Sequence, residues 1–323
     1  MSKPEIVAIA PLPAFFAKPL HENFTVHDLH GAADAEARRA LIAKIAPTTR
    51  GMVAFGGSQL APDQLAKFPH LEIISVFGVG YDGMPLAACA EAKVKVTNTP
   101  DVLNDEVADT AVALTLMTCR QFVGAHKFVE AGDWLKGQYP LTHSLWGKTV
   151  GIIGLGRIGK GIAERLAAHK MSVAYFGRNK QDVPYTYYGS LVEMAGDVDV
   201  LIAITPGGAA TKHLVNAAVL EALGPTGFFI NVARGSVVDQ DALVKAIESG
   251  TIAGAGLDVF EAEPKVPEAL FNRRNVVLLP HVASATHETR QAMADLAVEN
   301  LALHFAGKPV KTLVPELAGK VSP

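Results

Sequence analysis

The stretch GIIGLGRIGKGIAERL, residues 151–166, decides how the chain folds. Gly154, Gly156 and Gly159 have the G-x-G-x-x-G spacing and stand between an apolar, strand-like run and an amphipathic, helix-like run. In that setting glycines permit a tight turn and a close approach of backbone to a pyrophosphate, and the next helix directs its N-terminus at the same group. A glycine-rich turn without a ligand is the alternative reading. The predicted cofactor contacts of this turn are Gly154, Leu155, Gly156, Arg157, Ile158 and Gly159.

The segment YFGRNK, residues 175–180, indicates which dinucleotide is bound. About 20 residues beyond the glycine motif a carboxylate normally holds the ribose 2′-hydroxyl. Here Gly177 occupies that place and Arg178 follows it. A guanidinium without a neighbouring carboxylate suits a 2′-phosphate. We therefore predict contacts from Arg178 and Asn179 and a preference for NADPH, with NADH possible. The alternative is that Arg178 and Lys180 are solvated loop cations.

Apolar runs alternate with helical patterns along the whole chain, which is typical of βαβ units. One series precedes Asn98, and a long amphipathic helix follows Pro100. A second series contains KTVGIIG, MSVAYF, VDVLIAI, GFFIN, GAGLDV and VVLLP, and a last helix spans about Thr286 to Phe305. The pattern predicts an α/β protein with doubly wound parallel sheets.

Composition narrows the classes of partner. Lys and Arg total 29 against 32 Asp and Glu, so a basic surface for nucleic acid is not expected. No apolar run reaches the roughly 18 residues of a membrane span. Cys89 and Cys119 are too few for a disulfide framework or a metal cluster, so we predict no metal and a cytoplasmic location.

Three further stretches each place one chemically versatile side chain just after a strand-like run. They are FFINVARGSVVDQDAL, AGAGLDVFEAEP and NVVLLPHVASAT, which contain Arg234, Glu263 and His281. Because parallel sheets bind ligands at the carboxyl ends of their strands, these groups are expected to meet as an acid–base set. Glu261 is as acidic as Glu263, and the choice of Glu263 rests on its position directly before Pro264.

In these motifs the chain resembles the D-isomer-specific 2-hydroxyacid dehydrogenases, and most closely their glyoxylate/hydroxypyruvate reductase branch. The resemblance rests on G-L-G-R-I-G, N-V-A-R-G-x-x-V-D, L-D-V-F-x-x-E-P and P-H-x-A-S-A-T, in that order. It implies a Rossmann cofactor domain at residues 100–286, inserted into a flavodoxin-like substrate-binding domain made of residues 1–99 and 287–323. It also implies a homodimer built largely on the cofactor domains.

Carried over by position, the resemblance assigns catalytic roles. Arg234 would bind the carboxylate and carbonyl of a 2-oxo acid, and His281 would protonate the carbonyl oxygen. Glu263 would orient His281, and an imidazole beside a carboxylate suits a general acid. Asp258 would hold the nicotinamide carboxamide.

Other residues are assigned to the ligands by the same resemblance. Backbone N–H groups of Val79 and Gly80, in SVFGVGYDGMP, would bind the substrate carboxylate, although this string is also readable as a plain turn. Val107 and Thr110 are expected near the nicotinamide. The remaining predicted cofactor contacts are Thr205, Pro206, Thr211, Val232, Ala233, Arg234, Asp258, His281 and Ala283.

These assignments predict NADPH-dependent reduction of glyoxylate and hydroxypyruvate to glycolate and D-glycerate. Two alternatives stay open: a reductase for bulkier acids such as phenylpyruvate or hydroxyphenylpyruvate, and a dinucleotide-sensing, corepressor-like protein without turnover. Three places depart from the expected pattern: GYDGMP replaces a more usual acid-containing continuation, Gln240 stands where Glu is common, and Ala283 stands where Gly is common. The methyl group of Ala283 is expected to influence which substrates fit.

Overall fold

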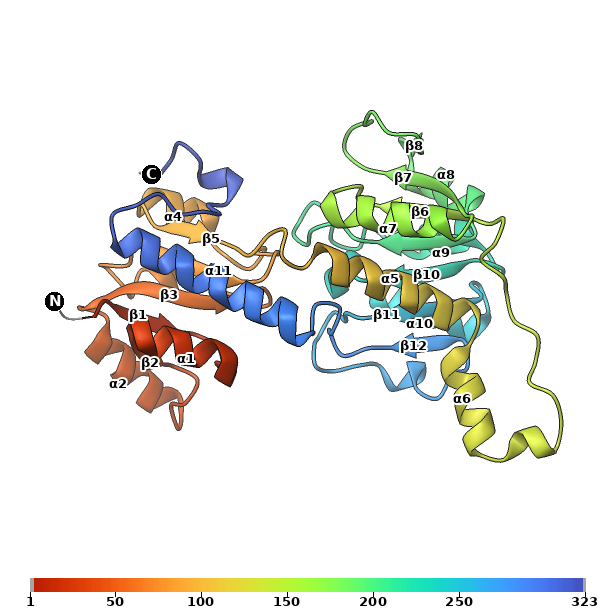
Figure 1. The fold of residues 1–323 in the computed structure, drawn as a ribbon, viewed down its shortest axis with the longest axis horizontal. Coiled ribbons are helices and arrows are strands. Elements are labelled where there is room, and N and C mark those ends of the chain that lie inside the picture. Colours follow the sequence, from red (N-terminus) through yellow and green to blue (C-terminus); the bar gives the residue numbers. More distant parts are fainter. Residues whose placement is uncertain (1–2, 322–323) are drawn as a thin grey trace. The chain divides into compact units, whose positions relative to one another are not determined.

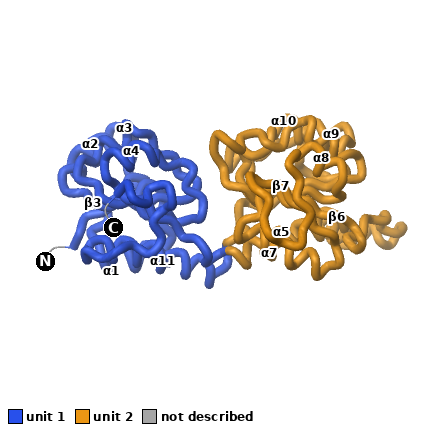
Figure 2. Tube along the Cα trace, turned by 90° about the horizontal axis from the view of Figure 1, so that it is seen from above, with its two compact units in different colours: residues 1–103, 285–323 blue, residues 104–284 orange. Residues whose placement is uncertain are grey.

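The computed structural model describes residues 3–321, which form two compact units (Figure 2). One unit runs to Leu103 and resumes at Ala285, and the other is Asn104–Ser284. The domain limits expected from the sequence, at 99/100 and 286/287, differ from these by a few residues. Residues 1–2 and 322–323 of the expected substrate-binding domain lie outside the described residues.

The discontinuous unit is built on a five-stranded parallel sheet with the order β2-β1-β3-β4-β5 (Figure 1). This is the flavodoxin-like order 2-1-3-4-5. The strands are β1 (Glu5–Ala8), β2 (Thr25–Asp28), β3 (Thr49–Phe55), β4 (Ile73–Phe77) and β5 (Lys95–Thr97). The helices are α1 (Ala14–Asn23), α2 (Ala35–Ile45), α3 (Pro62–Leu65), α4 (Leu86–Glu91), α11 (His287–Phe305) and the 3₁₀ turn η4 (Pro315–Leu317).

The C-terminal helix completes the core of this unit. Every residue of β4 is buried, as expected for a central parallel strand covered on both faces. Helix α11 begins after Thr286, whose hydroxyl accepts a hydrogen bond from the Thr289 amide and so satisfies a free N–H of the first turn. It packs on β4, where the Ser75 hydroxyl donates to the Ala297 carbonyl at 3.0 Å. Helix α11 thus belongs to the same core as strand β4.

The continuous unit is built on a seven-stranded parallel sheet with the order β12-β11-β10-β9-β6-β7-β8. Counted from β6, this contains the Rossmann order 3-2-1-4-5-6. The strands are β6 (Thr149–Ile153), β7 (Ser172–Phe176), β8 (Thr186–Tyr188), β9 (Val200–Ala203), β10 (Phe228–Asn231), β11 (Gly254–Leu257) and β12 (Val276–Leu278). The helices are α5 (Asn104–Cys119), α6 (Phe122–Glu130), α7 (Arg157–Ala168), α8 (Leu191–Asp197), α9 (Ala217–Leu223) and α10 (Gln240–Ser249), with 3₁₀ turns η1 (Asp133–Leu135), η2 (Gly235–Val237) and η3 (Glu268–Leu270).

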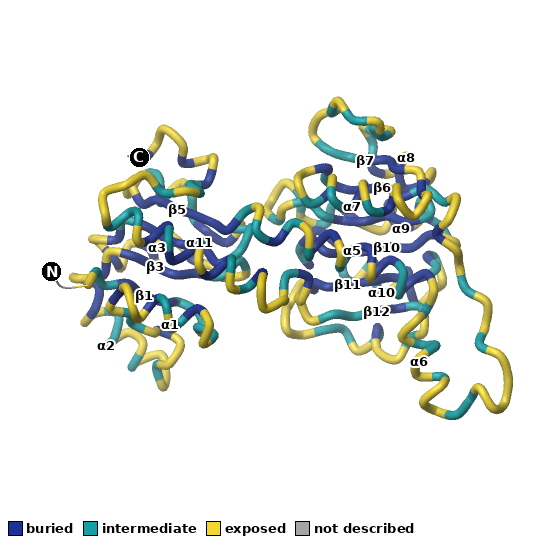
Figure 3. Tube along the Cα trace, in the orientation of Figure 1, coloured by how far each residue is buried: buried dark blue, intermediate teal, exposed yellow. Residues whose placement is uncertain are grey.

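The predicted fold class is confirmed, since both units are parallel α/β sheets flanked by helices. The inner strands of both sheets are mostly buried (Figure 3), and β4, β9, β10 and β11 are buried at every residue. The expected apolar face of α5 is buried too, from Val107 through Ala111 and Leu114 to Thr118. No helix in the described part of the chain combines the length and apolar character needed to cross a bilayer.

Candidate active site

The glycine turn lies between β6 and α7 and has the geometry that a pyrophosphate requires. Gly154 has φ +100°, and a Cβ there would lie 3.1 Å from the Ile204 carbonyl oxygen. A Cβ at Gly159 would lie 2.2 Å from the Gly154 carbonyl oxygen, so only glycine lets the helix pack this closely. A Cβ at Gly156 would meet nothing within 4 Å, which leaves open space beside the first turn of α7. The turn therefore fits a dinucleotide.

The loop after β7 presents a cation next to this turn. Arg178 and Asn179 are exposed, and a Cβ at Gly177 would meet nothing within 4 Å. Within residues 3–321 Arg178 has no ion-pair or hydrogen-bond partner. The side chain of Gln181, which sequence reasoning did not single out, donates to the Leu155 carbonyl at 2.9 Å. This bond ties the cationic loop to the glycine turn.

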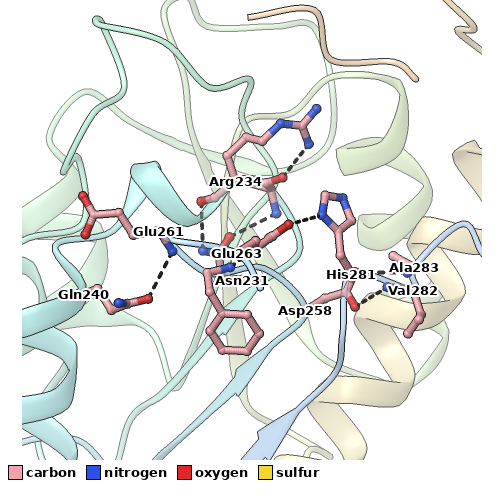
Figure 4. Close-up of polar contacts among 11 residues, drawn as sticks. Asn231, Arg234, Gln240, Asp258, Glu261, Glu263, His281, Val282 and Ala283 are labelled. Carbon is pink, nitrogen blue, oxygen red and sulfur yellow. Dashed lines mark hydrogen bonds and ion pairs between the residues drawn. The ribbon is translucent and has the colours of Figure 1, made fainter. Parts of the chain in front are cut away.

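A histidine and a glutamate meet at the carboxyl edge of the same sheet (Figure 4). The Nδ1 atom of His281, which follows β12, lies 2.8 Å from Oε2 of Glu263, which follows β11. The other oxygen of Glu263 accepts from the Phe260 amide at 3.0 Å. Burial acts to raise the pKa of Glu263, but the hydrogen bonds from His281 and Phe260 and the charges of His281 and Arg234 lower it overall. Glu263 is thus a carboxylate at neutral pH, and it holds the Nδ1 edge of the His281 ring, whose Nε2 atom has no hydrogen-bond partner among residues 3–321.

Asp258 fixes the backbone on which His281 stands. His281 has φ +54°, an uncommon left-handed conformation for a residue with a Cβ. Its amide donates to the Asp258 carbonyl at 2.8 Å, and the next two amides, of Val282 and Ala283, donate to the Asp258 carboxylate at 2.8 and 3.0 Å. Burial raises the pKa of Asp258, although the two amide donors favour its ionised form. These bonds hold the imidazole in a set position before any ligand arrives.

Arg234 follows β10 and stands beside the histidine and glutamate. Its guanidinium and the His281 ring extend to the same side of Glu263 in Figure 4. Asn231, buried at the end of β10, donates to the Arg234 carbonyl at 3.1 Å and accepts from the Ala233 amide at 3.0 Å. An imidazole with a fixed carboxylate and an adjacent guanidinium can bind an anionic substrate and transfer a proton to it.

Comparison with known proteins agrees with this geometry. A model of the NAD binding domain of the D-isomer specific 2-hydroxyacid dehydrogenases matches residues 112–283. The chain belongs to this family. It is 45% identical over 310 residues to a hydroxyphenylpyruvate reductase of Plectranthus scutellarioides (96% of this chain, 98% of the relative). It is 41% identical to a glyoxylate/hydroxypyruvate reductase of Arabidopsis thaliana, with the same coverage of both chains.

A solved structure gives the same result. The NADPH-dependent glyoxylate/hydroxypyruvate reductase of Sinorhizobium meliloti, in complex with NADP and malonate, superposes with a TM-score of 0.91 at 47% identity, covering 98% of each chain. As a D-isomer specific 2-hydroxyacid dehydrogenase, this chain is an NAD(P)-dependent oxidoreductase.

The other sequence-predicted contacts of the dehydrogenase lie mainly along the same sheet edge. Thr205, Pro206 and Thr211 follow β9, and the Thr211 hydroxyl donates to the Pro206 carbonyl at 2.7 Å. Val232 and Ala233 follow β10 and are buried. Their contacts with a cofactor remain predictions.

Helix α5 also reaches this region of the dehydrogenase, because the Thr110 hydroxyl donates to the Ala283 carbonyl at 3.2 Å. Ala283 itself is buried. Val79 and Gly80 follow β4 in the other unit.

A second histidine–glutamate pair supports the loop of Glu263, and sequence reasoning did not find it. Glu261, the rival candidate, lies 2.9 Å from His213 Nε2, and its amide donates to the Gln240 side chain at 3.1 Å (Figure 4). Gln240 therefore has a role of its own, because its amide oxygen accepts this bond without adding a second negative charge beside Glu261. The two glutamates of FEAEP thus have different partners: Glu261 pairs with His213, and Glu263 pairs with His281.

Gly235 allows the loops of Arg234 and Glu263 to touch, and substitution there is expected to be severe. A Cβ at this position would lie 1.9 Å from the Phe260 carbonyl carbon and 2.3 Å from the Glu261 amide nitrogen. Gly235→Ala must displace one of these backbones, so kcat/KM is expected to fall about 100-fold, because errors of about 1 Å in a catalytic group cost that much. Gly189→Ala, at a loop position without a positive φ where a Cβ meets nothing within 4 Å, is the matched control. Equal kinetics for the two variants would contradict the prediction.

Proposed function

We propose that this dehydrogenase reduces the small 2-oxo acids glyoxylate and hydroxypyruvate to glycolate and D-glycerate with NADPH. The observation that carries the proposal is the 2.8 Å pair of His281 and Glu263 beside Arg234, on the sheet edge that also holds the glycine turn. Reductases of these two acids are among its relatives at 41% and 47% identity.

The chemistry follows from the residues in place. Arg234 binds the substrate through its guanidinium, which matches a carboxylate and stabilises negative charge that develops on the carbonyl oxygen. The nicotinamide, when bound, supplies a hydride to the carbonyl carbon. His281 gives the proton on Nε2 to the carbonyl oxygen, so that hydride and proton together convert the ketone to an alcohol. Glu263 keeps the ring oriented and stabilises its charged form before the proton leaves.

The turn and cationic loop are proposed to hold the cofactor. The amides at the start of α7 would face the pyrophosphate, and the exposed guanidinium of Arg178 would pair with the 2′-phosphate. Open space at Gly177, where a carboxylate would repel that phosphate, supports NADPH as the preferred cofactor.

Arg178→Ala is expected to lower kcat/KM for NADPH about 10-fold or more while changing that for NADH less than about twofold, because only the phosphate loses a partner. Steady-state kinetics with both cofactors measures this. Lys245→Ala, on the exposed face of α10, is the control for loss of one positive charge. An unchanged NADPH/NADH ratio would make Arg178 a solvated loop cation.

Reduction of hydroxyphenylpyruvate is the second candidate function, and the 45% identity to the Plectranthus scutellarioides reductase favours it. The deciding experiment compares kcat/KM for glyoxylate, hydroxypyruvate, phenylpyruvate and hydroxyphenylpyruvate with each cofactor. Faster turnover of the two small acids supports the proposal, and faster turnover of the aromatic acids replaces it. Tight NADPH binding with no turnover of any oxo acid would support the corepressor-like alternative.

A cytoplasmic homodimer is proposed for the assembled protein. Large apolar side chains are exposed along residues 122–146, where Leu135 and Leu141 are 94% and 100% exposed and both tryptophans of the chain protrude. Such a concentration marks a surface that another protein covers. The same segment borders a groove of about 620 Å³ lined by Phe128, Tyr139 and Leu278 among others. Light scattering after gel filtration tests the dimer, and a monomer at micromolar concentration would contradict it.

A further inference from the structure

The loop after β4 is held so that two of its amides have fixed directions. The Thr99 amide donates to the Gly78 carbonyl at 2.9 Å, and the Asn98 side chain donates to the Val79 carbonyl at 2.8 Å. In a planar trans peptide the N–H points away from the C=O of the same unit. Fixing these two carbonyls therefore fixes the N–H groups of Val79 and Gly80 on the opposite side. Asn98 and Thr99 thus orient the two amides proposed to bind a substrate carboxylate.

Asn98 is fixed in turn by the C-terminal segment. The Thr312 hydroxyl donates to the Asn98 carbonyl at 2.6 Å, and the Asn98 amide donates back to the Thr312 carbonyl at 3.3 Å. The same hydroxyl accepts from the Asn300 side chain at 2.8 Å. Asn300 is fully buried on α11, and its oxygen accepts from the amides of Lys311 and Thr312. A continuous chain of hydrogen bonds therefore runs from α11 through the C-terminal segment to the loop.

A second contact ties the same two segments together. The Tyr81 hydroxyl, one residue beyond the loop, donates to Glu316 at 2.9 Å. Burial raises the pKa of Tyr81 to about 12, so the hydroxyl keeps its proton and remains a donor. Two positions of the C-terminal segment, Thr312 and Glu316, thus bear on residues 78–81 from more than 200 positions away in the sequence.

We propose that Asn98 and Thr312 are positioning residues for substrate binding, and that the C-terminal segment 311–316 sets the direction of the Val79 and Gly80 amides toward the carboxylate of a 2-oxo acid. The inference rests on the proposed function. It adds residues that touch neither substrate nor cofactor and act only through the loop. Such residues affect the binding of the oxo acid and leave the binding of NADPH unchanged.

The test compares Asn98→Ala and Thr312→Val with the wild-type enzyme. Each removes a side-chain donor, and the KM for glyoxylate is expected to rise about 10-fold while the KM for NADPH stays within about twofold. Thr312→Ser keeps the hydroxyl and is expected to restore the wild-type KM. Thr97→Val is the matched control, because the buried Thr97 hydroxyl has no partner among residues 3–321. Its kinetics are expected to equal those of the wild type.

The outcomes separate this inference from the function on which it rests. If the wild type turns over glyoxylate and both variants keep its KM, or if both cofactor and substrate KM values rise together, the positioning role is wrong. If the wild type turns over no oxo acid, the proposed function is wrong, and calorimetry with oxalate then tests the loop alone. Weaker oxalate binding by the variants supports the inference, and equal or absent binding overturns it. If Asn98→Ala does not fold, Thr312→Val with its serine counterpart decides the question.

Discussion

Replacement of His281 with alanine is expected to lower kcat for oxo-acid reduction by about 10²–10⁴-fold, the usual contribution of a positioned general acid. The backbone amides of 281–283 that bind Asp258 are retained in this variant, so the loop keeps its shape. Affinity for NADPH, measured by nicotinamide fluorescence, is therefore expected to change little. Steady-state kinetics with the preferred oxo acid gives the kcat.

Two further variants make this prediction specific. Glu263→Gln removes the negative charge but keeps an oxygen near His281 Nδ1, so a smaller fall than in His281→Ala is expected. His126→Ala removes a histidine of an exposed pair with Glu130 on α6 and is expected to leave kcat unchanged. Retention of more than about a tenth of wild-type kcat by His281→Ala would contradict the general-acid role.

The Glu263 carboxylate also gives this site a pH dependence of known sign. Because its pKa in the folded protein is lowered below the ordinary value of 4.5, the stabilisation from its ionised form is complete above that value. It is lost as the pH falls through the lowered pKa. Glu263 therefore stays ionised in neutral and mildly acidic solution and can bind His281 there.

Most of the fold could be predicted because buried parallel strands are continuous apolar runs. β4 and β9 are buried at every residue, and such runs stand out in the sequence. The edge strands β2 and β8 were not predicted. Their residues, TVHD and TYY, are largely exposed or half-buried, so neither forms an apolar run. β12 is an edge strand as well, but its largely buried run VVL is apolar and is part of the predicted series.

The residues of the site also fall into a group that the sequence predicts and a group that it does not. Arg234, Glu263 and His281 could be named from the sequence because they follow the neighbouring strands β10, β11 and β12, and the topology of a parallel sheet then places them at the same carboxyl edge. The side chains that hold them carry no such local signal. Gln181 reaches Leu155 across 26 residues, and Thr312 reaches Asn98 across 214. Contacts of this kind depend on the final packing, and single polar residues in loops do not reveal them.

Arg234→Lys is expected to lower kcat/KM for the oxo acid by about 10²-fold and Arg234→Ala by about 10³-fold, because a guanidinium binds a carboxylate through two parallel hydrogen bonds and an ammonium does not. The loop that carries Arg234 is held by Asn231, which forms hydrogen bonds with the Ala233 amide and the Arg234 carbonyl. Neither substitution removes these backbone groups, so both variants are expected to keep the loop conformation. A fall in kcat and a rise in substrate KM are both expected, because the same group binds the carboxylate and stabilises charge on the carbonyl oxygen.

Addition of guanidinium ion to the solution distinguishes a catalytic role of Arg234 from a merely structural one. It is expected to restore part of the kcat of Arg234→Ala and none of that of His281→Ala, because it replaces the missing cation and transfers no proton. Arg273→Lys, beside Glu248 on the surface, is the matched control and is expected to retain wild-type kinetics. If Arg234→Lys also retained wild-type kinetics, a single positive charge would suffice. Binding of the carboxylate through two parallel hydrogen bonds from Arg234 would then be wrong. A rise in substrate KM alone, with kcat unchanged, would instead confine Arg234 to binding the carboxylate and leave stabilisation of the carbonyl oxygen to His281.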